Sequence, residues 1–123
     1  MKFIKDTVGR DTQLIRGYEP GRVTVNDTPL THSFIVASDR LVTDWPPQRF
    51  EEMTAEHLKA ALALDPEILI IGTGDKQHFL TGELMGALSR GTLGVEMMDT
   101  AAACRTYNVL LSEGRKVVAA ILI

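Results

Sequence analysis

Cysteine and long apolar runs are scarce in this chain, and each shortage excludes a class of protein. The single cysteine, Cys104, cannot form an internal disulfide, which favours a reducing compartment. The longest apolar run, Val117 to Ile123, has seven residues, whereas a membrane-spanning helix needs about 20. We therefore expect no membrane span.

Basic residues are not in excess either. The 13 Lys and Arg residues stand against 16 Asp and Glu residues, for a net charge of −3, and both signs are spread along the chain. A nucleic-acid-binding protein would show a basic stripe, so we expect no nucleic-acid partner. Residues 1–6 lack the apolar segment of a signal peptide. These features predict a cytoplasmic protein.

Complete catalytic or metal-binding motifs are also missing. His32, His57 and His78 lie 25 and 21 residues apart, so no two of them have the spacing of metal ligands. The chain has no Gly-x-Ser-x-Gly motif, in which a nucleophilic serine sits on a sharp turn. We expect no metal site and no cofactor.

The length and composition predict a single domain, residues 1–123, that buries about two-thirds of its unfolded surface. The first half alternates apolar and polar residues and turns often, as antiparallel strands do. Asn26 to Pro29 is a turn signal, because Asx side chains bond their own turns and Pro pre-sets φ. Strands are predicted at 13–16, 22–25, 33–37 and 41–43.

Helical spacing begins at Thr54, a plausible N-cap residue, and ends at Asp65-Pro66. Beyond it, strands are predicted at 67–71, 94–98 and 116–122, and helices at 81–89 and 100–112. Strands that alternate with helices in this way predict an α/β fold with a parallel or mixed sheet.

Two turns follow predicted strands and are candidates for a ligand site. In Gly72-Thr73-Gly74 the glycines let a backbone approach an anion closely, and Lys76 lies nearby. A dinucleotide-binding fingerprint would need a further glycine where Gln77 stands. A tight turn that needs a positive φ is the alternative interpretation.

Asp99-Thr100 opens the last predicted helix. Proteins with α/β folds bind their ligands outside the carboxyl ends of strands and at helix N-termini, which is where Asp99-Thr100 is predicted to lie. The alternative is that one of these residues only caps the helix. If both turns face one another, they form a small polar cleft.

Arg105 and Asn108 share one face of the same helix, with the small Ala101 one turn before. An arginine among small residues could hold a ligand carboxylate bidentately, or it could pair with an internal acid. We predict Gly72, Thr73, Gly74, Asp99, Thr100, Arg105 and Asn108 as ligand-binding residues.

Cys104 and Trp45 each have two interpretations. A thiol near a helix N-terminus can be acidified, but Cys104 lies beside the apolar stripe of its helix and is predicted to be a small core residue. Trp45 precedes two prolines, so it could anchor a partner protein or close the end of the sheet.

Taken together, several blocks of sequence resemble one family of small uncharacterised bacterial and archaeal domains. This family also includes the adipogenesis-associated domain protein and a mitochondrial complex I assembly factor. The blocks occur in order along the chain, at 70–74, 98–100, 102–110 and 113–115. The resemblance implies a three-layer α/β fold, with a central mixed sheet, helices on one side and a smaller antiparallel β layer on the other. It implies no established enzymatic activity.

The resemblance and the missing catalytic motifs predict a non-catalytic interaction protein that helps to assemble respiratory complex I or another membrane-associated complex. Trp45 and the surface near Asp99 are the predicted contacts. This chain lacks the targeting extension of the mitochondrial relative, so mitochondrial import is not expected. The alternative function is binding of a small anionic ligand between the Gly72–Gly74 turn and Asp99-Thr100. A homodimer is a third option, because an apolar strand at the end of the chain could recruit a second copy if its edge is unpaired.

Overall fold

The structure, a computed structural model, describes residues 12–89 and 91–123. The predicted absence of a signal peptide concerns residues outside this range. The described elements are, in order, β2 (Ile15–Glu19), β3 (Arg22–Val25), β4 (Thr28–Leu30), β5 (Phe34–Ala37), β6 (Arg40–Val42), the short 3₁₀ helix η1 (Phe50–Glu52), α1 (Ala55–Leu62), β7 (Ile68–Thr73), α2 (Gly82–Leu88), β8 (Gly94–Met98), α3 (Thr100–Ser112) and β9 (Val117–Leu122).

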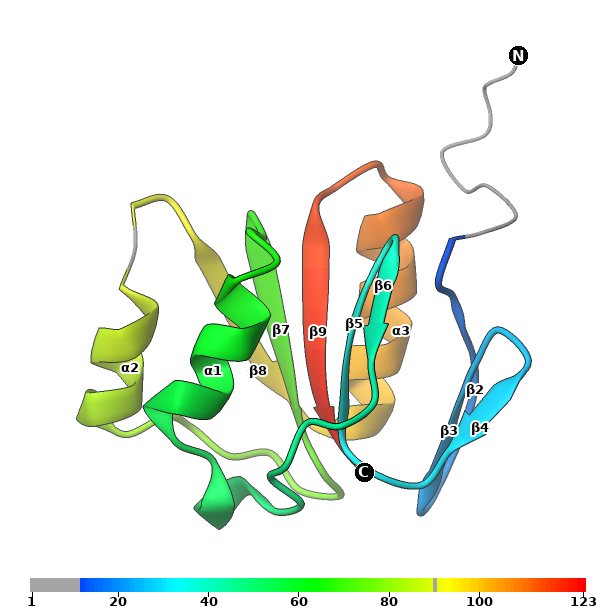
Figure 1. The fold of residues 1–123 in the computed structure, drawn as a ribbon, viewed down its shortest axis with the longest axis horizontal. Helices are drawn as coiled ribbons and strands as arrows, with labels where there is room; N and C mark the ends of the chain where they lie inside the picture. Colours follow the sequence, from blue (N-terminus) through cyan, green and yellow to red (C-terminus); the bar gives the residue numbers. More distant parts are fainter. Residues whose placement is uncertain (1–11, 90) are drawn as a thin grey trace.

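These strands form two sheets (Figure 1). A small antiparallel sheet has the order β2-β3-β4, and a larger mixed sheet has the order β6-β5-β9-β7-β8. In the larger sheet β7 pairs in parallel with both β8 and β9, while β5 is antiparallel to β6 and β9. The predicted α/β fold, with a central mixed sheet and a smaller antiparallel β layer, is confirmed.

The helices are divided between the two faces of the larger sheet. One hydrophobic cluster joins α1 and α2 to one face, through residues such as Leu58, Leu84 and Ile71. A second cluster joins α3 and the small sheet to the opposite face, through residues such as Tyr107, Val23 and Ile70. The resemblance implied helices on one side only. The structure differs in this part, because the apolar stripe of α3 packs on the same face of the larger sheet as the small sheet does (Figure 1).

The C-terminal strand β9 is the middle strand of the larger sheet. It lies between β5 and β7, and all six of its residues are buried. A strand covered on both faces is expected to read as a continuous apolar run, as Val117 to Leu122 does. The homodimer option required an unpaired edge on the C-terminal strand. Because β9 is paired on both sides, it offers no such edge.

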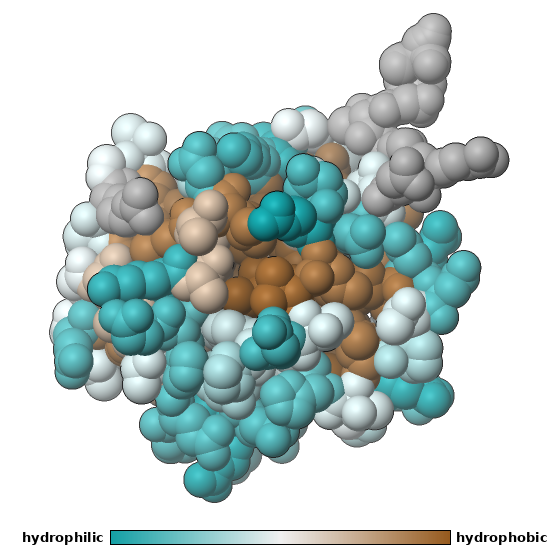
Figure 2. Space-filling model, viewed as in Figure 1, coloured by the Kyte–Doolittle hydropathy of each residue, from teal (hydrophilic) through white to brown (hydrophobic). Residues whose placement is uncertain are grey.

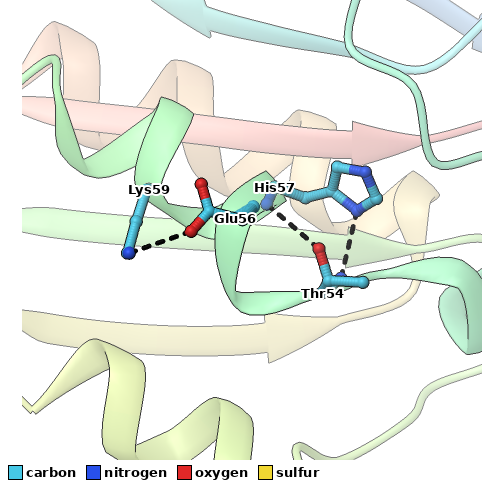
Figure 3. Close-up of polar contacts among 4 residues, drawn as sticks. All are labelled: Thr54, Glu56, His57 and Lys59. Atoms are coloured by element: carbon cyan, nitrogen blue, oxygen red, sulfur yellow. Dashed lines mark hydrogen bonds and ion pairs between the residues drawn. The ribbon is translucent and has the colours of Figure 1, made fainter.

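Capping signals explain why several element bounds agree with the prediction. Asp99 caps α3, and its carboxylate Oδ1 accepts a hydrogen bond from the Ala102 N–H at 2.9 Å. Thr54 and His57 form a reciprocal capping box at the start of α1 (Figure 3). The first strand differs from its prediction, because it starts at Ile15 and continues to Glu19.

The turn that was predicted over Asn26 to Pro29 is shorter in the structure. It comprises Asn26 and Asp27, with Asn26 at φ 52°, and Thr28 already starts β4. Pro29 is tolerated there because β4 is an edge strand of the small sheet, where a missing N–H breaks no ladder.

Candidate functional site

The two turns predicted as a ligand site do meet at the carboxyl ends of β7 and β8. The Thr100 N–H donates to the Gly74 carbonyl at 2.8 Å, and the Gly74 N–H donates to Thr100 Oγ1 at 2.9 Å. The Thr100 hydroxyl in turn donates to the Leu122 carbonyl at the end of β9. Thr100 is 1% exposed, so this residue ties three chain segments together inside the protein.

The remaining polar groups of the two turns also have internal partners. The Thr73 hydroxyl lies 3.2 Å from the Met98 carbonyl oxygen and 2.5 Å from that of Lys76. The Asp99 carboxylate caps α3 as described above. The hydroxyls of Thr73 and Thr100 and one oxygen of the Asp99 carboxylate thus form hydrogen bonds within the fold. Ligand binding by Gly72, Thr73, Gly74, Asp99 and Thr100 stays a prediction.

Gly72 lies close against α3 and β9. A Cβ atom at this position would lie 3.0 Å from Ala103 Cβ, 3.0 Å from Ile121 Cδ1 and 3.2 Å from Thr100 Oγ1. Because carbon atoms prefer separations near 3.5–4.0 Å, only a residue without a side chain fits there unchanged. Gly72 therefore has a packing role that does not require a ligand. Gly74, at φ +95°, has the positive φ expected of a tight turn.

Asn108 lies against β2 and is part of the scaffold there. Its side-chain Oδ1 accepts from the Ile15 N–H at 3.1 Å, and its Nδ2 donates to the Ile15 carbonyl at 2.6 Å. One amide side chain thus satisfies both backbone groups of a residue 93 positions away. Sequence spacing could not reveal this contact.

Arg105 lies beside Asn108 on α3, with an exposed side chain. Within residues 12–89 and 91–123 it forms no ion pair, so the expected internal acid partner is not found there. It lines a shallow hollow of about 300 Å³ together with Arg16, Tyr18 and Ala101. Neither Arg105 nor Asn108 is brought to the Gly72–Gly74 turn.

A second, larger hollow of about 580 Å³ lies beside Gly74. The β2–β3 hairpin, the 48–51 segment and the loop after β7 line it. On its wall the Phe50 and His78 rings stack with centroids 4.5 Å apart and an angle of 12° between their planes. Lys76, which also lines it, has an exposed side chain without an ion pair in the described part of the chain.

Cys104 is a core residue, as predicted. Its side chain is 4% exposed, and burial raises the pKa of its thiol to about 12. A thiol with so high a pKa is almost entirely protonated at neutral pH, which makes it a poor nucleophile. The described residues contain no group of three or more His, Cys, Asp or Glu side chains arranged to hold a metal ion.

Trp45 closes the sheet and is not an exposed anchor for a partner. It is 2% exposed, and its Nε1–H donates to the His57 carbonyl at 2.9 Å. The same histidine accepts from the Thr54 N–H at 3.0 Å through Nδ1 (Figure 3). The prediction that Trp45 contacts a partner is wrong, because the indole is used to cover the core.

Exposed apolar residues in the region around α2 were not predicted from the sequence. Phe79 is 74% exposed and Met85 is 54% exposed. A signal existed for Met85, because the buried Leu84 and Leu88 stand four residues apart and mark the inner face of α2. Met85 follows Leu84 by about 100° around the helix, so it lies at the rim of that face.

Comparison with known proteins gives agreement along most of the chain. The family model described as "Protein of unknown function (DUF498/DUF598)" matches residues 15–122. A "13 kDa major membrane protein" of Francisella tularensis is 31% identical over 101 residues, which are 81% of this chain and 82% of that protein. A crystal structure of a Bordetella parapertussis protein is 42% identical, with a TM-score of 0.85, and the match covers 90% of this chain and 95% of that one.

One group of similar proteins carries a functional name. The bovine "NADH dehydrogenase (ubiquinone) 1 alpha subcomplex assembly factor 3" is 34% identical over 83 residues. The match covers 66% of this chain and 45% of the bovine protein, so the chain spans about half the length of that relative. None of the helices in the described residues has the length and apolar character needed to cross a bilayer.

Proposed function

The chain belongs to the DUF498/DUF598 family of proteins of unknown function, and from this membership we propose that it is a non-catalytic assembly factor. Its target would be a membrane-associated respiratory complex, with complex I as the first candidate. The observation that carries the proposal is the 34% identity to the bovine complex I assembly factor over 66% of this chain. The similarity to a bacterial major membrane protein supports a site of action at the membrane.

The arrangement of the candidate catalytic groups supports a binding role. Cys104 is buried and protonated, and the ring nitrogen Nδ1 of His57 accepts a backbone hydrogen bond. An assembly factor needs surface complementarity in place of a reactive group. Figure 2 shows hydrophobic residues reaching the surface in a band across the middle of one face, which is a common feature of interaction surfaces.

The proposal includes a cytoplasmic location, from which the chain would reach the membrane complex. The single, buried cysteine supports a reducing compartment. Fractionation of cells would test this part, since the chain should appear in the cytoplasmic fraction and on the inner surface of membranes. Recovery outside the cytoplasm would contradict it.

A cross-linked pull-down tests the assembly role. The chain would be tagged at residue 1, cross-linked in its own cells, and purified from detergent-treated membranes, with the tag alone as control. Subunits of complex I, or of another respiratory complex, should be enriched over the control. Recovery without any respiratory or membrane-insertion component would count against the proposal.

A second candidate function is binding of a small anionic molecule. The hollow of about 580 Å³ beside Gly74 is the space considered for it, because the exposed Lys76 lines that space without an ion pair among the described residues. The other charges balance, since Arg49 is paired with Glu52 and the acidic Glu51 and Asp75 also line the hollow. A thermal-shift screen with anionic metabolites would test it, using Lys76→Ala and, as matched control, Lys59→Ala on α1. A stabilising compound should lose its effect only in Lys76→Ala, and a screen without any stabilising compound would exclude this function.

A further inference from the structure

Strand β8 is an open edge of the larger sheet. It pairs with β7 in a continuous register from Gly94 to Met98, and no strand of residues 12–89 or 91–123 pairs with its other side. Natural edge strands are usually protected by shortness, proline, lysine or a bulge. The opposite edge, β6, has three residues and begins with Arg40. β8 has five residues in a continuous register, without proline, lysine or a bulge, and its one charged side chain is Glu96.

The backbone of β8 shows which groups are open. The Gly94 N–H donates to the Glu67 carbonyl, and the Met98 carbonyl accepts from Thr73, so these residues point toward β7. Because alternate residues of a strand point their N–H and C=O groups to the same side, those of Val95 and Met97 point away. The Met97 carbonyl receives the Gln77 side chain at 3.3 Å. Among the residues that the structure describes, none forms a hydrogen bond with the N–H or C=O of Val95 or with the Met97 N–H, so these three groups are available to an added strand.

Apolar side chains line the same edge. Val95 and Met97 are half-buried and pack on the hydrophobic cluster under α1 and α2. A groove of about 460 Å³ runs between α2 and β8, with Met85, Leu88, Leu93 and Val95 in its wall. An added strand would place every second side chain into this groove, as expected from the two-residue period of a strand.

Glu96 indicates which charge an added strand would carry. It lies on the opposite face of β8 from Val95 and Met97, is exposed, and has no ion pair or side-chain hydrogen bond in the part of the chain that the structure describes. A second copy paired antiparallel over all five residues would set Glu96 against Glu96. Like charges directly opposite each other destabilise a strand pair, whereas a Lys or Arg would be favoured there.

We propose that the open edge of β8 binds an extended segment of a partner protein, with a basic residue between two apolar residues. The basic residue would face Glu96, and its apolar neighbours would lie beside Val95, which lines the groove along α2, and beside Met97, which packs on the same hydrophobic cluster. Main-chain hydrogen bonds would supply affinity, and the side-chain pattern would supply selectivity. This inference rests on the proposed assembly role and names the surface that would perform it.

A peptide titration followed by amide NMR tests the inference without any respiratory complex. The probe is the peptide Gly-Thr-Val-Lys-Val-Thr-Gly at millimolar concentration, and the control peptide has Glu in place of Lys. The Val95 and Met97 amide signals should move with the Lys peptide, and binding of the Glu peptide should be about tenfold weaker or undetectable, since about 1.4 kcal/mol corresponds to tenfold.

Two substitutions complete the test. Glu96→Lys should reverse the preference between the two peptides, while Asp27→Lys, with the same change in net charge at the β3–β4 turn, should leave it unchanged. The inference is overturned if neither peptide moves the β8 amides, or if Glu96→Lys does not alter the preference. It is also overturned if the β8 amides shift with protein concentration alone, because a second copy would then be the occupant. A failed pull-down with positive titrations would reject the respiratory target and keep the surface.

Discussion

Replacing Gly72 by alanine tests whether this glycine serves the packing of α3 or the approach of a ligand. The new methyl group would lie 3.0 Å from two carbon atoms and 3.2 Å from Thr100 Oγ1. The Ile121 methyl can rotate away, but Ala103 Cβ moves only with the whole helix. Thr100 is held by its hydrogen bonds to Gly74 and Leu122. The helix must therefore shift outward or these hydrogen bonds must lengthen.

Overpacking of this kind costs about 1–3 kcal/mol in the free energy of unfolding. With an unfolding entropy of about 2.1 cal/mol/K per residue, a chain of 123 residues loses about 4 °C in Tm for each kcal/mol. Gly72→Ala should therefore lower Tm by about 4–12 °C, measured by differential scanning calorimetry or by circular dichroism.

Gly86→Ala is the matched control. Gly86 lies within α2, and a Cβ there would meet no atom within 4 Å. Alanine in place of glycine inside a helix should raise stability by about 0.5–1 kcal/mol. A Gly72→Ala protein as stable as the wild type would refute the packing argument, and a ligand role for this glycine would regain support.

Two further predictions concern α3. Asn108→Ala removes both hydrogen bonds to the Ile15 backbone. The free energy of unfolding, measured by urea titration, should therefore fall by about 1–3 kcal/mol. A loss below about 0.5 kcal/mol would show that Asn108 does not hold β2. Burial raises the pKa of Cys104 to about 12, so the thiol should react with Ellman's reagent only in concentrated urea, and rapid reaction of the native protein would contradict its burial. The thiol of the unfolded chain ionises near pH 8.5, so on raising the pH the unfolded state loses its proton before the native state does. The contribution of Cys104 to stability is therefore complete below about pH 8.5 and is lost as the pH rises toward 12. A Cys104→Ala protein should show a smaller loss of stability over that range.

Local signals predicted the second half of the chain well. The strand over 94–98 and the helix over 100–112 have the predicted bounds. Asp99 caps the start of α3, and Gly114, at φ +78°, ends it. Both signals depend only on residues a few positions away. The buried runs at β7 and β9 were recognisable because a strand covered on both faces lacks polar alternation.

Long-range contacts explain what could not be predicted. The position of β9 in the middle of the sheet depends on its pairing with β5, more than 80 residues earlier in the chain. Asn108 was grouped with Arg105 by helical spacing, but its partner is the backbone of Ile15 in another sheet. The sequence left Trp45 either as a partner anchor or as a residue that closes the end of the sheet, and its contact with α1 decides for the second. Each of these features is set by tertiary packing.

The most direct test of the assembly role is the state of the respiratory complexes in cells without this chain. Membranes from a deletion strain would be resolved on native gels and assayed for NADH:quinone oxidoreductase activity, with wild type, Glu96→Lys and Asp27→Lys supplied from a plasmid. The account predicts less fully assembled complex and lower activity in the deletion strain, restored by wild type and Asp27→Lys but not by Glu96→Lys. Unchanged levels of every respiratory complex in the deletion strain would contradict it.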